Sequence, residues 1–85
     1  AYTEYLKSLG GKVESNTVSG TVSRKEIVGN FAYFTVENNN DIVYKVALDM
    51  NSKLYVMMKG DYISFNYILQ ESEYLVVEID SLVLA

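Results

Sequence analysis

The carboxylates near the end of this sequence are the side chains best suited to chemistry. Glu78 and Asp80 are two positions apart, so in a strand they would share one face, where one can act as an acid and the other as a base. Glu71 and Glu73 come shortly before them. Surface carboxylates at this spacing are common, and no other polar constellation accompanies them. We therefore expect no catalytic residues and no enzyme activity.

The chain contains no histidine and no cysteine. Zinc sites, thiolate nucleophiles and histidine-based acid/base catalysis are therefore largely excluded. Residues 37–41 offer oxygen ligands, but their spacing does not match an EF-hand loop, and a solvated turn is the better interpretation. The glycines at 10, 11 and 60 lack the pattern of a phosphate-binding loop. We expect neither a metal nor a cofactor.

Charge is distributed unevenly along the chain, whose net charge is −4. Residues 1–60 hold all seven basic residues and six acidic ones, whereas residues 61–85 hold five acidic residues and no basic one. A nucleic-acid binder usually has a basic surplus, so the overall balance disfavours that function, although the first 60 residues are more permissive. No apolar run approaches the roughly 20 residues that a membrane span needs.

The chain, residues 1–85, is predicted to form a single, mainly β domain. Residues 3–9 are expected to form a short N-terminal helix, because apolar side chains recur at helical spacing and Gly10 follows. The remainder of residues 1–16 is a connector, residues 17–80 form a barrel, and residues 81–85 are an apolar tail.

Alternating apolar and polar residues predict five strands. They are expected at residues 17–28, 31–37, 42–48, 61–69 and 73–80. Gly20 indicates a bulge or bend inside the first strand, which would let that strand serve two sides of a small barrel. Turns are expected at residues 29–30, 38–41 and 70–72.

The inward faces of these strands form the predicted core. Its members are Val18, Val22, Phe34, Val36, Tyr44, Val46, Ile63, Phe65, Leu75, Val77 and Ile79. Tyr67 and Leu69 are also expected to face inward, whereas Val43, Lys45 and Ala47 are expected to face outward.

Residues 50–58 are the ambiguous segment. Asp49 is suited to cap a short helix there, and Lys59-Gly60 is typical of a helix end, although the β-branched and aromatic residues also allow a strand. We favour the helix, which would close the bottom of the barrel. Alternatively, it presents a soft surface to a partner, formed by Tyr55, Met57 and Met58.

The order of elements resembles the OB-fold, a five-stranded Greek-key barrel with a helix between its third and fourth strands. Three features carry the likeness: Val18-Ser19-Gly20-Thr21-Val22, the hairpin of residues 31–37 and 42–48, and Lys59-Gly60-Asp61-Tyr62-Ile63. The likeness covers about residues 17–80 and is to a superfold, not to a single family. An SH3-like or other small barrel is the alternative.

The resemblance implies a binding site, because OB-folds usually hold ligands across the second and third strands. That surface would offer aromatic rings for stacking on bases and cations for phosphates, as single-strand binding requires. The implied site consists of Arg24, Lys25, Phe31, Tyr33 and Lys45, with the acidic strands after residue 60 facing away. Alternatively, the two rings pack beneath the N-terminal helix or a loop.

We therefore expect a non-catalytic binding module with single-stranded nucleic acid as its leading ligand. The alternative is a protein-interaction or structural domain of a larger protein or assembly, which would use an edge strand or residues 55–58. A small-molecule or glycan binder comes third. The sequence indicates neither oligomeric state nor compartment.

Overall fold

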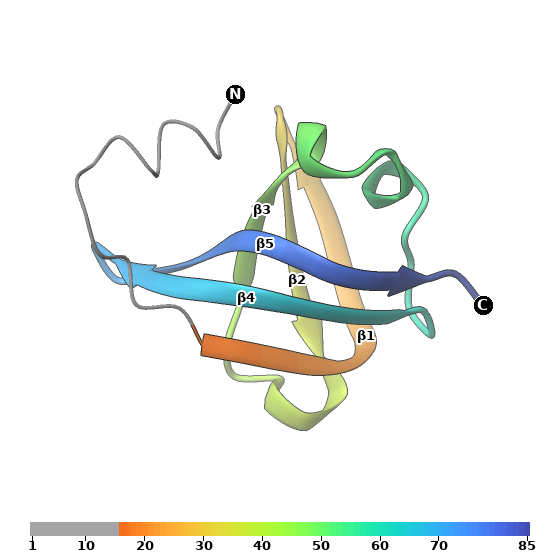
Figure 1. Ribbon diagram of the computed structural model, residues 1–85, viewed down its shortest axis with the longest axis horizontal. Helices are drawn as coiled ribbons and strands as arrows, with labels where there is room; N and C mark the ends of the chain where they lie inside the picture. Colours follow the sequence, from red (N-terminus) through yellow and green to blue (C-terminus); the bar gives the residue numbers. More distant parts are fainter. Residues whose placement is uncertain (1–15) are drawn as a thin grey trace.

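The computed structural model describes residues 16–85, which form five strands and three short 3₁₀ turns (Figure 1). The strands are β1 (Asn16–Val28), β2 (Phe31–Val36), β3 (Tyr44–Ala47), β4 (Tyr62–Gln70) and β5 (Glu73–Val83). The turns are η1 (Glu37–Asn39), η2 (Leu48–Met50) and η3 (Ser52–Tyr55). The helix expected at residues 3–9 lies outside the described residues.

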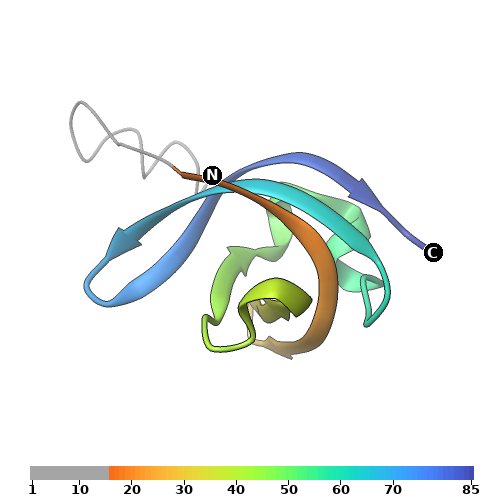
Figure 2. The same ribbon diagram turned by 90° about the horizontal axis from the view of Figure 1, so that it is seen from below.

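The strands close into a barrel in the order β1-β2-β3-β5-β4, and β4 returns to pair with β1 (Figures 1 and 2). Paired strands are antiparallel except β3 and β5, which are parallel. The prediction of a mainly β, five-stranded barrel is confirmed. The third strand is shorter than expected, and the fifth continues to Val83, so part of the expected tail is strand.

β1 pairs with two neighbours. Residues 16–21 pair with β4, and the part from Val22 onward pairs with β2. The register against β2 shifts between Val22 and Arg24, so the irregularity lies just after Gly20. Gly20 itself packs closely on β2, since a Cβ there would lie 3.4 Å from the Cβ of Val36. The bent strand thus serves two sides of the barrel, as expected.

Apolar side chains from all five strands fill the barrel. The rings of Phe34, Tyr44 and Phe65 are buried together, and the closest pair, Tyr44 and Phe65, has centroids 4.8 Å apart. Val22, Val36, Val46 and Ile63 are completely buried around them, as predicted, and Val18 and Ile79 pack partly buried against this cluster. Further core residues are Leu54, Met57, Val76 and Leu82.

The prediction for the inward face of β5 was wrong in part. Two register shifts in its ladder with β4 each give β5 one extra residue, which reverses the face of the positions that follow. Val76 therefore enters the main core in place of Val77. Leu75 is buried in a separate cluster with Ile68, against which Val77 packs.

Leu69 was expected to face inward but is 61% exposed. It lies beyond the last described pair of β1 with β4, which joins Asn16 to Tyr67, so no described residue of β1 pairs with it. Figure 2 shows this end of the β4–β5 hairpin extending away from the other strands. Tyr67 is partly buried at the edge of the core.

The segment between β3 and β4 forms η2 and η3 in place of the single helix expected at residues 50–58. Asn51, not Asp49, caps η3, because its side chain accepts a hydrogen bond from Lys53 N at 2.9 Å. Leu54 and Met57 are buried in the core, so the segment covers one end of the barrel.

The Lys59-Gly60-Asp61 connection joins the start of β4 to β1. Gly60 has a φ of +102°, which favours glycine, and its N donates to Val22 O at 2.9 Å while Val22 N donates to Asp61 O at 2.7 Å. The Asp61 carboxylate accepts hydrogen bonds from Ala85 N and Met58 N, and these lower its pKa. Within residues 16–85, no helix has the length and apolar character to cross a membrane.

Candidate functional site

The outer surface of β2 and β3 brings together three residues of the predicted site. The register between these strands runs without a break, so Phe31, Tyr33 and Lys45 point to the same side, and Tyr33 pairs directly with Lys45. Lys45 Nζ lies 4.4 Å from the ring centroid of Phe31 and 6.0 Å from that of Tyr33. Ring faces attract a cation at these distances. The lysine thus joins two half-buried rings into one aromatic, cationic surface.

Glu73, the first residue of β5, also reaches this surface. Its Oε2 lies 3.4 Å from Lys45 Nζ, and the parallel pairing of β3 with β5 explains the approach. The expectation that the acidic residues after position 60 face away is therefore wrong for Glu73. Its carboxylate partly offsets the charge of Lys45, and because Glu73 is 49% exposed the pair is open to solvent.

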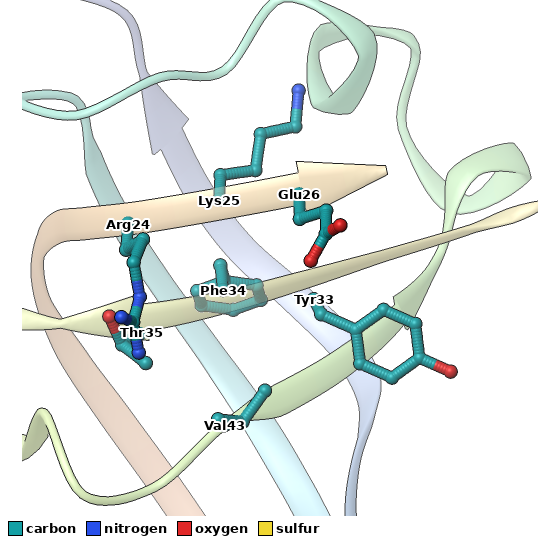
Figure 3. A pocket seen from close by; sticks show the side chains of 7 residues that line it. All are labelled: Arg24, Lys25, Glu26, Tyr33, Phe34, Thr35 and Val43. Carbon is teal, nitrogen blue, oxygen red and sulfur yellow. The ribbon is translucent and has the colours of Figure 1, made fainter. Parts of the chain in front are cut away.

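Arg24 and Lys25, both predicted for the site, point to opposite sides of β1 (Figure 3). Arg24 pairs with Thr35, an outward position, whereas Lys25 pairs with the buried Phe34. Lys25 Nζ donates to the Tyr55 carbonyl at 3.1 Å, and burial lowers its pKa while nearby Asp61 opposes the shift. The structure therefore places Arg24 on the same outer surface as Phe31, Tyr33 and Lys45, whereas the Lys25 side chain turns away from that surface toward Tyr55.

We call this face the β1–β3 outer surface and define it by the outward residues of the three strands. They are Arg24, Glu26, Val28, Phe31, Tyr33, Thr35, Lys45 and Ala47, and we add Val43, which lies just before β3 and borders the same face. Glu26 is the charged member that the predicted site left out. Its signal was local, because Glu26 follows Arg24 by two positions on one strand.

A hollow of about 220 Å³ lies on this surface beside Tyr33 (Figure 3). Arg24 and Glu26 border it from β1, and Val43 closes it from the side of β3. Thr35 lies at its buried base, 2.7 Å from Ser23, which donates in turn to the Asn40 side chain. Lys25 and Phe34 also border the hollow, but the Lys25 side chain points away from it (Figure 3). The side chains of Arg24, Glu26 and Tyr33 thus present a cation, a carboxylate and a ring around it.

A second hollow, of about 360 Å³, lies where β2 and β3 meet η2 and η3. Its lining consists of Asn30, Phe31, Ala47, Leu48, Asp49 and Tyr55. A hydrogen bond from Leu48 N to Asn30 O, 3.0 Å long, holds the two chain segments together beneath it. No local sequence pattern links Tyr55 to Phe31, because the connection after β3 brings Tyr55 back from a distant position.

The carboxylates considered first form no reactive constellation in the described part of the chain. Glu78 Oε1 accepts a hydrogen bond from Asn66 Nδ2 at 2.7 Å, and Asn66 Oδ1 accepts one from Thr17, so these polar groups form an exposed ladder across β5, β4 and β1. From residue 16 onward, no group of three acidic residues is arranged to hold a metal ion.

No protein-family model, curated protein or solved structure matches this chain. The function proposed below therefore rests on the geometry of the described residues.

Proposed function

We propose that this chain is a non-catalytic module with an OB-type barrel that binds single-stranded nucleic acid on its β1–β3 outer surface. The observation that carries the proposal is the placement of Lys45 Nζ against both the Phe31 and the Tyr33 rings. Bases stack on such rings, and the neighbouring cation meets the phosphate between them. The OB assignment is supported by the strand order and by the sharing of β1 between two neighbours.

Charge on this surface is nearly balanced, which shapes the expected binding. Arg24 and Lys45 supply two positive charges, and Glu26 and Glu73 place two carboxylates beside them. Stacking therefore supplies most of the affinity, and phosphate contacts supply little. We expect a shallow salt dependence, with a slope corresponding to about one or two phosphate contacts.

Titration of a labelled single-stranded oligonucleotide at about 50 mM and about 200 mM salt tests the proposal. Tyr33→Ala should remove about 1–3 kcal/mol of binding free energy, the value of one stacked base. Lys45→Ala should weaken binding and reduce the salt slope by roughly one unit, without sequence preference.

Tyr62 on β4 provides the matched control, since it is 41% exposed and lies outside the β1–β3 outer surface. Tyr62→Ala should leave binding unchanged. If Tyr33→Ala mainly lowers the melting temperature and has no effect on affinity, the Tyr33 ring is a structural element and no stacking surface exists there. Absence of binding even at low salt would refute the nucleic-acid function.

A protein-interaction module is the second candidate, and exposed apolar side chains favour it. Val56 and Met58, between η3 and β4, are 61% and 64% exposed, and Val83 at the end of β5 is 56% exposed. The Asp61 hydrogen bonds to Met58 N and Ala85 N bring these two segments together. If oligonucleotides do not bind, this surface is the leading site for a partner, and Met58→Asp should disrupt the complex.

A further inference from the structure

We propose that the second hollow, between Phe31 and Tyr55, is a further base-binding position that prefers a base carrying an amino group. This inference rests on the proposed function and extends it beyond the β1–β3 outer surface. The ligand would be a single strand with one base at Tyr33 and a neighbouring base in the hollow.

The lining of the hollow suits a flat, largely apolar ring. Phe31 and Tyr55 border it, and Ala47 and Leu48, which are 4% and 3% exposed, form its floor. Its volume of about 360 Å³ lies at the lower end of the range for small-ligand sites. An apolar floor with aromatic sides and a few polar groups at the rim is the usual construction of such a site.

Tyr55 presents an exposed ring on a fixed backbone. Tyr55 is 60% exposed, yet Leu54 just before it and Met57 two residues after it are buried in the core. Lys25 Nζ holds the Tyr55 carbonyl from β1 at 3.1 Å. Because the backbone is already ordered, a base that stacks on this ring orders little more than the side chain, which favours binding. Lys25 thereby acts as a positioning residue for this hollow.

The spacing of the Phe31 and Tyr33 rings favours a nucleic-acid strand whose neighbouring bases are not stacked on each other. Phe31 and Tyr33 are two residues apart on β2, so their Cα atoms are separated by roughly 6.8 Å along the strand. Stacked bases within one strand of a duplex are about 3.4 Å apart. Neighbouring bases must therefore be splayed to use both hollows, which a duplex does not allow.

The rim of the hollow determines which base fits. Asp49 supplies carboxylate oxygens, which only accept hydrogen bonds, and Asn30 supplies an amide. A carboxylate pairs well with an exocyclic amino group such as the cytosine N4 amine. The negative charge of Asp49 also repels phosphate. The sugar-phosphate backbone of the strand therefore stays near Lys45, and only the base enters the hollow. Thymine lacks the amino group and should bind less well.

The first test compares Tyr55→Ala with Val56→Ala, using a labelled oligo-dC of about 12 nucleotides. Val56 is the matched control, because it is as exposed as Tyr55 and does not line the hollow. Tyr55→Ala should weaken binding by roughly 5- to 150-fold, Tyr55→Trp should retain it, and Val56→Ala should change it by less than about twofold. Lys25→Met should weaken binding in the wild-type background but add nothing to Tyr55→Ala.

Two results separate this inference from the proposed function. If the wild-type protein binds and Tyr33→Ala weakens binding while Tyr55→Ala does not, the second base position is refuted and the proposed function stands. If the wild-type protein binds no oligonucleotide, both are refuted.

The second test measures the ratio of affinities for oligo-dC and oligo-dT. Asp49→Asn should lower this ratio by roughly 2- to 12-fold, because one hydrogen bond to the amino group is lost and the new amide can donate to thymine. An unchanged ratio would refute the preference for an amino base.

Discussion

The β1–β3 outer surface and the outward side of β4 and β5 belong to one barrel but differ in chemistry. The first carries Arg24 and Lys45 among aromatic rings. The second carries the Asn66–Glu78 ladder and the Ile68–Leu75 cluster, and residues 61–85 contain no Lys or Arg. A closed barrel therefore allows two unlike exteriors around one core.

The two surfaces meet at the parallel contact of β3 with β5. There, Lys45 of the first region pairs with Glu73 of the second. On the inside of the same contact, Tyr44 stacks edge-on with Tyr67 and Tyr74, at centroid distances of 5.3 and 6.0 Å. The separation between the regions thus concerns their surfaces, while their interior is continuous.

Phe65→Ala gives the largest expected effect and tests whether the two regions share one core. The ring is fully buried and contacts Phe34 and Tyr44 on the opposite strands, so its loss should lower the free energy of unfolding by roughly 3–5 kcal/mol. Urea denaturation measures this change. Leu69→Ala, on the same strand but exposed, is the control and should cost less than about 0.5 kcal/mol. Separate unfolding of the two regions would contradict the shared core.

Tyr44→Phe tests the β3–β5 contact, where the two regions meet. The substitution should raise the free energy of unfolding by about 1 kcal/mol. Tyr44 is fully buried, and its hydroxyl makes no well-formed hydrogen bond within residues 16–85, although nearby Asn39 acts weakly to lower its pKa. Removal of an unsatisfied polar atom relieves its desolvation cost. A loss of stability in the phenylalanine variant would show that the hydroxyl has a partner.

The same residue gives a pH dependence. Burial raises the pKa of Tyr44, with Tyr67 and Tyr74 adding to the shift. Above pH of about 10, the unfolded chain releases the phenol proton while the folded chain retains it, so stability should fall as pH rises. Urea midpoints at alkaline pH should fall less steeply for Tyr44→Phe than for the wild type. Equal slopes would show that Tyr44 does not contribute.

Glu73→Gln gives the smallest expected effect and sharpens the contrast between the surfaces. The substitution removes the carboxylate that β5 places beside Lys45, so oligonucleotide affinity should rise by roughly 1.4- to 5-fold. Glu78→Gln, on the β4–β5 side, is the matched control and should have a smaller effect. Equal effects of the two substitutions would indicate that the net charge of the protein, and not the position of the Glu73 carboxylate beside Lys45, determines oligonucleotide affinity.

Prediction from the sequence succeeded where strand registers are regular. Alternation placed Phe31, Tyr33 and Lys45 on one face because β2 and β3 pair without a break. It failed for β5, whose two extra residues have no signature in its sequence. Alternation along β1 also predicts that Arg24 and Lys25 point to opposite sides, so the sequence alone could have excluded Lys25 from the site.

Other parts of the site depend on contacts between distant segments, and no local pattern indicates these. Glu73 reaches Lys45 because β5 pairs with β3 in parallel. Tyr55 lines the same hollow as Phe31 because two 3₁₀ turns lie in the connection between β3 and β4. Both relationships arise from topology and could be found only with the tertiary structure.

The shared strand β1 has a consequence for how the molecule folds. Its pairs with β2 are close in sequence, so this hairpin can form early, whereas residues 16–21 must wait for residues 62–67 before the barrel closes. Closing so long a loop costs chain entropy before the contacts repay it, which slows folding in β proteins of this kind. We therefore expect closure of β1 on β4 to be the late step. In pulse-labelled hydrogen exchange, amides of β2 and β3 should gain protection before those at the start of β1.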